Sequence, residues 1–174
     1  MRYKGKIYKR IMLLGNSGSG KSWTAQRLGE KTGYPVIYLD KECWQPGWTY
    51  PPQEEWEKKN REYISGREWI IDGNHHETLD MRVEAADLIL FFDINRLLCI
   101  YSVWKRHGHK RVDFPDYLDE KKDKAFWQFL GWVWKFPEKC RSGILNIRKN
   151  HPEKMFLTFR TRKEVSEFLN EIEP

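Results

Sequence analysis

The sequence lacks the features of disulfide-stabilised and membrane-spanning proteins. Its cysteines are few, odd in number and far apart, with no Cys-x-x-Cys pair and no zinc-site spacing: Cys43, Cys99 and Cys140. We therefore expect reduced thiols in or near the core. No apolar run approaches the roughly 20 residues that cross a bilayer. The best candidate, residues 88–104, is interrupted by Asp93, Asn95 and Arg96. We expect no association with a membrane.

Targeting and nucleic-acid motifs are also missing. The basic N-terminal residues 1–6 are not followed by an apolar segment or a cleavage site, which predicts a cytoplasmic protein. The formal net charge of +6 would suit a nucleic-acid partner. However, the chain shows no helix-turn-helix glycine pattern, zinc finger or RNP motif. The positive net charge is explained equally well by basic residues that bind phosphates in a kinase. Nucleic-acid binding therefore stays open, but no motif indicates it.

The chain does contain enough apolar material for one globular domain covering residues 1–174. It is 40% hydrophobic and 32% charged, which is typical of a folded protein. Hydrophobic patterning predicts strands at 10–15, 36–39, 69–71, 88–92 and 155–159. It predicts helices at 20–32, 53–64, 96–106, 124–136 and 138–149, and a last one containing Val165, Phe168, Leu169 and Ile172. This alternation predicts a three-layer α/β fold with a parallel sheet, whose ligands bind beyond the carboxyl ends of the strands.

The strongest motif is a phosphate-binding loop between the first strand and the first helix. The sequence G-x-x-x-x-G-K-S comprises Gly15, Asn16, Ser17, Gly18, Ser19, Gly20, Lys21 and Ser22. Glycines let the backbone curl so that successive N–H groups point at phosphate oxygens. In such loops the lysine reaches the β- and γ-phosphates and the serine hydroxyl ligates Mg²⁺. The loop therefore predicts ATP and Mg²⁺ as cofactors.

Two carboxylates are predicted at strand ends beside this loop. Asp72 would lie near Mg²⁺, with a plain turn carboxylate as the alternative. Asp40 would act as a general base or anchor the hydroxyl of the acceptor, with a helix or turn cap as the alternative. We expect the two side chains to lie near each other across adjacent strands.

Further segments resemble the topology modulation protein (FlaR-like) family of adenylate-kinase-related P-loop proteins. The resemblance covers nearly the whole chain and is carried by Arg10–Ser22, Tyr38-Leu-Asp, Trp44-Gln-Pro-Gly-Trp, Trp69-Ile-Ile-Asp-Gly-Asn, Ala86-Asp-Leu-Ile-Leu-Phe-Phe-Asp and Phe159-Arg-Thr-Arg-Lys-Glu-Val. It implies the nucleoside-monophosphate-kinase fold with sheet order 2-3-1-4-5, ATP binding and phosphoryl transfer. Trp23 departs from the usual threonine after Gly-Lys-Ser, which removes a hydroxyl donor.

The resemblance also implies roles for several arginines. Arg82 occupies a place like that of the acceptor-phosphate arginine of adenylate kinases, with a solvated helix residue as the alternative. A mobile lid is expected at about residues 105–140, where Arg106, Lys110, Arg111 or Arg141 would reach the transferred phosphate. Arg160, after the last strand, is expected beside adenine.

The leading functional hypothesis is an ATP-dependent phosphotransferase that acts on a nucleotide, a nucleoside or a similar small molecule. His75 and His76 could line the acceptor pocket, and Trp44, Trp48 and Trp56 could stack on a planar acceptor or simply pack in the core. The alternatives are an ATP-dependent regulator of DNA topology with little kinase activity, and a bare ATPase. A monomer and a homodimer both stay open.

Overall fold

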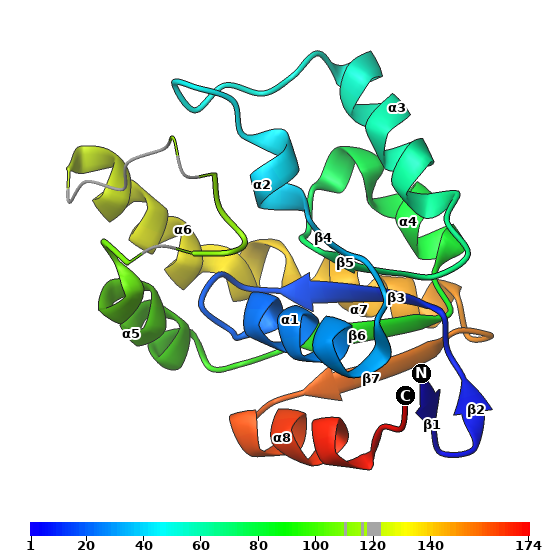
Figure 1. Cartoon of the computed structure of the whole chain (residues 1–174). Coiled ribbons are helices and arrows are strands. Elements are labelled where there is room, and N and C mark those ends of the chain that lie inside the picture. The colour runs from blue at the N-terminus through cyan, green and yellow to red at the C-terminus, as the bar shows by residue number, and fades with distance from the viewer. Residues whose placement is uncertain (110, 116, 118–122) are drawn as a thin grey trace.

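The structure, a computed structural model, describes residues 1–109, 111–115, 117 and 123–174. A five-stranded parallel sheet crosses the molecule (Figure 1). Its strands are β3 (Arg10–Gly15), β4 (Val36–Tyr38), β5 (Trp69–Asp72), β6 (Leu88–Phe92) and β7 (Met155–Phe159). They lie in the order β4-β5-β3-β6-β7, which confirms the predicted order 2-3-1-4-5. The labels are shifted by an antiparallel hairpin that was not predicted, β1 (Arg2–Tyr3) with β2 (Lys6–Ile7).

The central strands are apolar on both sides because helices cover both faces of the sheet. In β3, Ile11 and Leu13 belong to one core cluster and Met12 and Leu14 to the other, as the two-residue period of a strand requires. The first cluster includes residues of α1 (Lys21–Thr32), α5 (Arg96–Arg106) and α8 (Arg162–Glu171). The second includes residues of α3 (Gln53–Ile64), α4 (Leu79–Ala85) and α7 (Arg141–Asn150). The predicted three-layer α/β architecture is confirmed.

Several element boundaries differ from the prediction. The second strand ends at Tyr38, and Leu39 begins a short helix, α2 (Leu39–Cys43). One helical turn places Leu39 and Cys43 on the same side, and both are fully buried in the second cluster. The prediction of Asp40 at a strand end was therefore wrong, since Asp40 lies in α2. The 3₁₀ turn η1 (His76–Thr78) and α4 were not predicted, and α6 (Lys124–Lys139) runs past Pro137.

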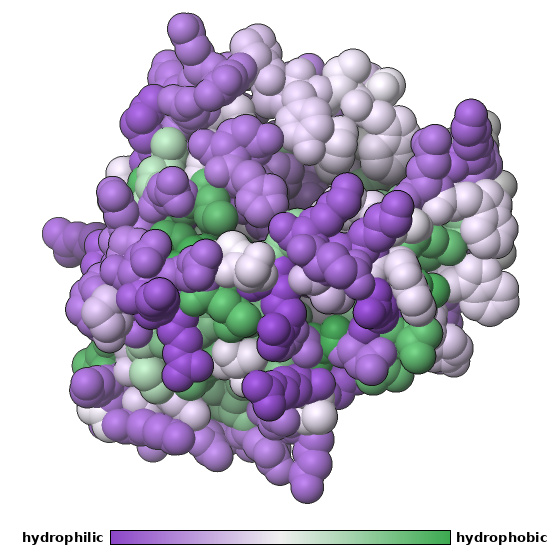
Figure 2. All heavy atoms as spheres, turned by 180° about the vertical axis from the view of Figure 1, so that it is seen from behind, coloured by the Kyte–Doolittle hydropathy of each residue, from purple (hydrophilic) through white to green (hydrophobic). Residues whose placement is uncertain are grey.

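One side of the molecule carries many exposed apolar side chains. They lie on α5 and α6 and include Leu97, Tyr101, Trp104, Trp127 and Trp134. Figure 2 shows pale and green residues along its right margin, on the side of these two helices. Such a surface is compatible with the homodimer left open above, which stays a prediction. In the described part of the chain, no helix is both long and apolar enough to cross a membrane.

Candidate functional site

The phosphate-binding loop connects the end of β3 to the start of α1. Gly15, Gly18 and Gly20 all have positive φ angles, of 143°, 78° and 100°. A Cβ atom on Gly18 would lie 2.3 Å from the carbonyl oxygen of Cys99, and one on Gly15 would lie 2.6 Å from that of Phe92. The loop thus needs glycine both for its backbone angles and for its close approach to β6 and α5. The predicted strand–loop–helix context is present.

Two asparagines hold this loop in place. The side chain of Asn74 accepts a hydrogen bond from the Gly15 amide (3.0 Å) and donates one to the Gly15 carbonyl (2.8 Å). The buried Asn16 side chain donates to the carbonyl of Val133 in α6 (2.8 Å). Asn74 was not predicted as a site residue, although it lies in the quoted Asp-Gly-Asn segment. Its signal would have been its position directly after a strand that neighbours β3.

Lys21 and Asp72 lie together at the loop. The Lys21 Nζ donates to the carbonyl of Asn16 at 2.9 Å. Asp72 ends β5 and is 5% exposed. Burial raises the pKa of its carboxyl to about 6, and the charge of Lys21 opposes this rise. Among the described residues, Asp72 Oδ1 has no hydrogen-bond partner. A buried carboxylate oxygen without a partner is the kind of group that a cation or a bound water satisfies.

A third carboxylate, which was not predicted, reaches the same place from the connection between α5 and α6. Asp113 accepts a hydrogen bond from the Ser22 hydroxyl at 2.7 Å. Arg111 binds both oxygens of this carboxylate, Nε to Oδ1 at 3.0 Å and Nη2 to Oδ2 at 2.7 Å. Although burial alone would raise the pKa of Asp113, the hydrogen bonds and charge of Arg111 together with Ser22 lower it to about 2. Its charge in turn helps to raise the pKa of Asp72.

Asp40 forms a pair with a histidine. The Nε2 of His75 lies 3.0 Å from Asp40 Oδ1. The His75 side chain is 6% exposed and that of Asp40 is 49% exposed, so the carboxylate keeps access to solvent. Burial works to raise the pKa of Asp40, but the hydrogen bond and charge of His75, with Lys21, hold it below its usual value. Asp40 and Asp72 lie near each other, as expected, since the charge of Lys21 acts to lower the pKa of both carboxyls and the charge of Asp40 helps to raise the pKa of Asp72.

Arg82 was expected to bind an acceptor phosphate or, as the alternative, to be a solvated helix residue, and the structure shows neither arrangement. Its side chain is fully buried in α4. The guanidinium donates to four backbone carbonyls, those of Thr78 (3.2 Å), Gly73 (2.9 Å), Asn74 (2.6 Å) and His75 (2.7 Å). Burial lowers its pKa to about 9. In this structure the guanidinium therefore holds the loop after β5, where His75 has the strained φ of 28°, and is not presented to a ligand.

The other predicted arginines lie at three places around the loop. Arg141 begins α7 and binds Asp93, which follows β6, with Nη2 to Oδ2 at 2.8 Å and Nε at 2.9–3.0 Å from the two oxygens. Arg106 ends α5 and is half-buried. Arg160 follows β7, is exposed, and donates its backbone N–H to Glu164 Oε2 at 2.7 Å. Lys110 lies outside the described residues.

Aromatic side chains gather near Asp40. The ring of Trp44 lies 5.6 Å from that of Trp48 and 4.5 Å from that of Tyr50, and Trp48 lies 5.3 Å from Phe114. Trp56 is 3% exposed and packs in the core, which confirms the alternative interpretation for that residue. Trp23 is 53% exposed, with Arg27 5.6 Å from its ring centroid. His76 Nε2 lies 3.9 Å from Cys140 Sγ.

The cysteines are reduced, and the described residues contain no cluster of side chains that would bind a metal ion by themselves. All three cysteines are buried and free, as predicted. Across residues 1–109, 111–115, 117 and 123–174, no three His, Cys, Asp or Glu side chains come together to hold a metal ion. Mg²⁺ in nucleotide sites needs no such cage, because phosphates and water supply most of its ligands.

Comparison with known proteins identifies the fold. No family model and no curated protein matches this sequence. Among solved structures, a gluconokinase from Sinorhizobium meliloti 1021 matches with 17% identity and a TM-score of 0.51, over 94% of this chain and 88% of that one. A shikimate kinase from Bacteroides thetaiotaomicron matches with 13% identity and a TM-score of 0.54, over 94% and 95%. At such low identity the likeness concerns the fold, and the chain has the three-layer α/β fold of the P-loop kinases.

Proposed function

We propose that this protein is an ATP-dependent phosphotransferase that acts on a small molecule. The observation that carries the proposal is the position of the loop Gly15–Ser22. It joins β3 to the N-terminus of α1, and the carboxylates of Asp72 and Asp40 lie near Lys21. A helix N-terminus with a glycine loop binds phosphate oxygens, and a cation beside it offsets charge on the transferred phosphoryl group.

The residues present fit Mg²⁺ bound together with the nucleotide. The Ser22 hydroxyl and the unpartnered Oδ1 of Asp72 would hold it, the latter directly or through water. When bound, Mg²⁺ offsets negative charge on the phosphate oxygens. Lys21 would contact the β- and γ-phosphates, and the backbone of Asn16, Ser17, Gly18, Ser19, Gly20 and Trp23 would complete the phosphate site. Arg160 would lie beside adenine.

Asp40 is the proposed general base or hydroxyl anchor. Its half-exposed carboxylate is ionised at neutral pH, since its pKa lies below the usual value, and it can accept the proton of an acceptor hydroxyl. We assign His75 the role of holding that carboxylate in position. Arg106, Arg111 and Arg141 are the proposed cations at the transferred phosphate. For Arg141 this role requires exchange of the Asp93 carboxylate for a phosphate. Arg111 would contribute its charge to the phosphate while it stays paired with Asp113.

Among the acceptor classes considered, an unphosphorylated hydroxyl compound fits better than a nucleoside monophosphate. The arginine expected to bind an acceptor phosphate, Arg82, already has backbone carbonyls as partners and is fully buried. The half-exposed rings of Trp48 and Tyr50 offer a stacking surface near Asp40. A nucleoside combines a planar base with free hydroxyls, and we propose this class first.

Membership of the topology modulation protein family is part of this proposal and rests on the sequence segments alone. The comparisons give no support to the alternative of a DNA-topology regulator. The expected single domain with a lid at about residues 105–140 is likewise proposed; among the described residues after α5, Asp113 contacts the loop through Ser22.

A transfer assay tests the proposal. Purified protein would be incubated with labelled ATP, Mg²⁺ and a panel of nucleosides, nucleotides and sugars, and phosphorylated products separated. We expect transfer to a hydroxyl compound, a loss of about 10²-fold or more in Lys21→Ala, and a comparable fall of kcat in Asp40→Asn. Unchanged thermal unfolding of both variants would be the control. ATP binding without transfer to any panel member, or full activity of Lys21→Ala, would refute the proposal.

A further inference from the structure

Asp113 occupies a position that its sequence context does not explain. It lies in the connection between α5 and α6, yet it is 6% exposed. Its carboxylate is fixed on one side by the Arg111 guanidinium and on the other by the Ser22 hydroxyl, 91 residues away in the chain. Burying a carboxylate is costly, and the contact it makes is with the loop residue assigned above to the cation.

The hydrogen bond determines the orientation of the Ser22 hydroxyl. A serine hydroxyl has one proton and two lone pairs. The hydroxyl donates its proton to Asp113 and also lies within hydrogen-bonding reach of the Asp72 carboxylate, so the lone pairs of Ser22 that face away from Asp113 are available to a cation. The buried Asp72 Oδ1, which has no partner among the described residues, is a second oxygen near the same place. The Ser22 hydroxyl and Asp72 Oδ1 thus both have lone pairs without a partner among the described residues, and such oxygens can bind a cation.

The charge of Asp113 has opposite effects on two forms of the nucleotide. A metal-free triphosphate repels the carboxylate, whereas a divalent cation bound to the triphosphate attracts it and offsets much of that repulsion. Both oxygens of Asp113 are already bound by Arg111, so the carboxylate acts through Ser22 and not as a direct ligand. The pair also connects to the aromatic cluster, because Arg111 lies 5.0 Å from the ring centroid of Phe114, which contacts Trp48.

We propose that Asp113 is a positioning residue for the cation half of the donor site. It accepts the proton of Ser22, turns the serine lone pairs toward Mg²⁺, and makes the loop prefer the Mg²⁺-loaded nucleotide over the metal-free one. The same contact also ties Arg111 and Phe114, which flank Asp113, to the loop residue Ser22. The inference rests on the proposed nucleotide site, and it does not depend on which acceptor is used.

Calorimetric titration with a non-hydrolysable ATP analogue, in Mg²⁺ and in EDTA, tests this role without any turnover. In Asp113→Asn we expect Mg²⁺-nucleotide affinity to fall about tenfold, as for loss of one charge-assisted contact. Metal-free nucleotide should bind equally well or more tightly, because a negative charge beside the phosphates is removed. Asp123→Asn is the matched control: Asp123 caps α6 through the Phe126 amide, and neither affinity should change.

A second variant tests whether Asp113 acts through Ser22. In a Ser22→Ala background, Asp113→Asn should change the Mg²⁺-nucleotide affinity less than about twofold, because the two substitutions remove the same contact. An equal loss for both nucleotide forms would mean a merely structural role and would overturn the proposal. Tighter Mg²⁺-nucleotide binding in Asp113→Asn would also overturn it, since Asp113 would then block the site. If the wild-type protein binds no nucleotide, the proposed function itself fails.

Discussion

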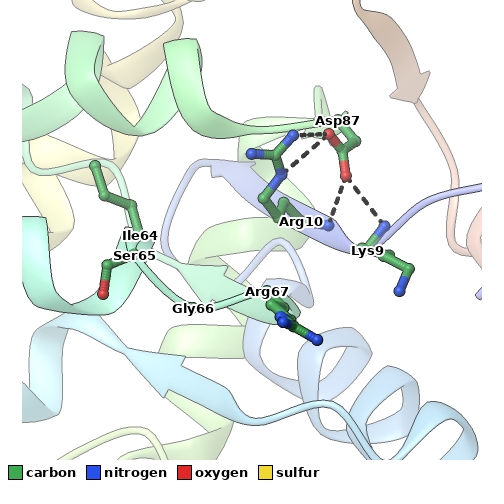
Figure 3. A pocket seen from close by; sticks show the side chains of 7 residues that line it. All are labelled: Lys9, Arg10, Ile64, Ser65, Gly66, Arg67 and Asp87. Atoms are coloured by element: carbon green, nitrogen blue, oxygen red, sulfur yellow. Dashed lines mark hydrogen bonds and ion pairs between the residues drawn. The ribbon is translucent and has the colours of Figure 1, made fainter.

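The two ends of the parallel sheet use charged residues in different ways. At the amino ends of the strands, charges pair on the surface: Arg10 binds Asp87 at 2.6 Å and Lys9 binds Glu68 at 2.9 Å. Lys9, Arg10 and Asp87 line a hollow of about 390 Å³ together with Arg67 (Figure 3). At the carboxyl ends, Asp72, Arg82 and Asp113 are buried. Asp72 has an oxygen without a partner among the described residues. The guanidinium of Arg82 donates to backbone carbonyls.

This difference indicates where the molecule binds a ligand. Surface ion pairs contribute little to stability and require little of their surroundings. Buried charges and unpartnered polar atoms cost stability, and natural proteins keep them mainly where function requires them. In the hollow of Figure 3 the carboxylate of Asp87 already accepts hydrogen bonds from the Arg10 side chain and from the Lys9 and Arg10 amides. We therefore place the site at the carboxyl ends, and the following substitutions test that contrast.

The largest effect is expected at Arg82. Arg82→Ala removes hydrogen bonds to four backbone carbonyls, two buried and two partly buried, and releases a loop that contains a residue with a strained φ. We expect the free energy of unfolding to fall by about 4 kcal/mol, measured by urea denaturation. Arg61→Ala in α3 is the control, because its exposed ion pair with Glu57 should contribute less than about 1 kcal/mol. A loss for Arg82→Ala as small as that of the control would contradict the assigned role.

Glycines of the phosphate loop come next. Gly18→Ala combines a positive φ with a Cβ only 2.3 Å from a backbone oxygen, and should cost about 3 kcal/mol and abolish nucleotide binding. Gly20→Ala has the positive φ but open space around its Cβ, so it should cost about 1 kcal/mol. Thermal unfolding and nucleotide titration measure both. Equal effects for the two variants would show that φ strain alone matters and that the contact with α5 does not.

The strand–loop–helix setting of the phosphate-binding loop could be predicted from the sequence because its signals are local. The loop Gly15–Ser22, the strand before it and the helix after it lie within 23 residues, and their spacing carries the chemistry. Sequence reasoning missed Asp113, because a carboxylate in a polar stretch has no periodicity, and its contact spans 91 residues. It placed Arg82 near the right loop, but no pattern shows that several carbonyls of that loop converge on one guanidinium. Asp40 was predicted at the end of a strand, but it lies in the short helix α2, which buries its neighbour Leu39.

A smaller effect of opposite sign is expected at Asp72. Burial, with the charges of Asp113 and Asp40, raises the pKa of its carboxyl to about 6, so the folded protein holds the charged form at a cost. Asp72→Asn removes that charge and should stabilise the ligand-free protein by about 2 kcal/mol, while weakening Mg²⁺-nucleotide binding. Urea denaturation in EDTA measures the first effect and calorimetry the second. If the ligand-free variant is less stable than the wild type, the buried charge of Asp72 does not cost stability, and the argument that it is kept for function fails.

The smallest effect belongs to the amino end. Although burial alone would raise the pKa of Asp87, hydrogen bonds from the Arg10 side chain and from the Lys9 and Arg10 amides lower it. The stabilisation by this carboxylate is therefore present above its unfolded pKa of about 4 and is lost as the pH falls through the lower folded value. Asp87→Asn should cost about 1 kcal/mol at neutral pH, and the difference from the wild type should shrink toward zero at low pH.

Urea denaturation between pH 7 and about pH 3 measures this difference, with Glu68→Gln as the control. Glu68 also pairs with a cation at this end, but both partners are more exposed, so its substitution should have almost no effect. Neither variant should change nucleotide affinity, because neither residue lies at the carboxyl end of the sheet. A pH-independent cost for Asp87→Asn would mean that its contacts act through shape and not through charge. A loss of nucleotide binding would show that the two ends of the sheet are coupled.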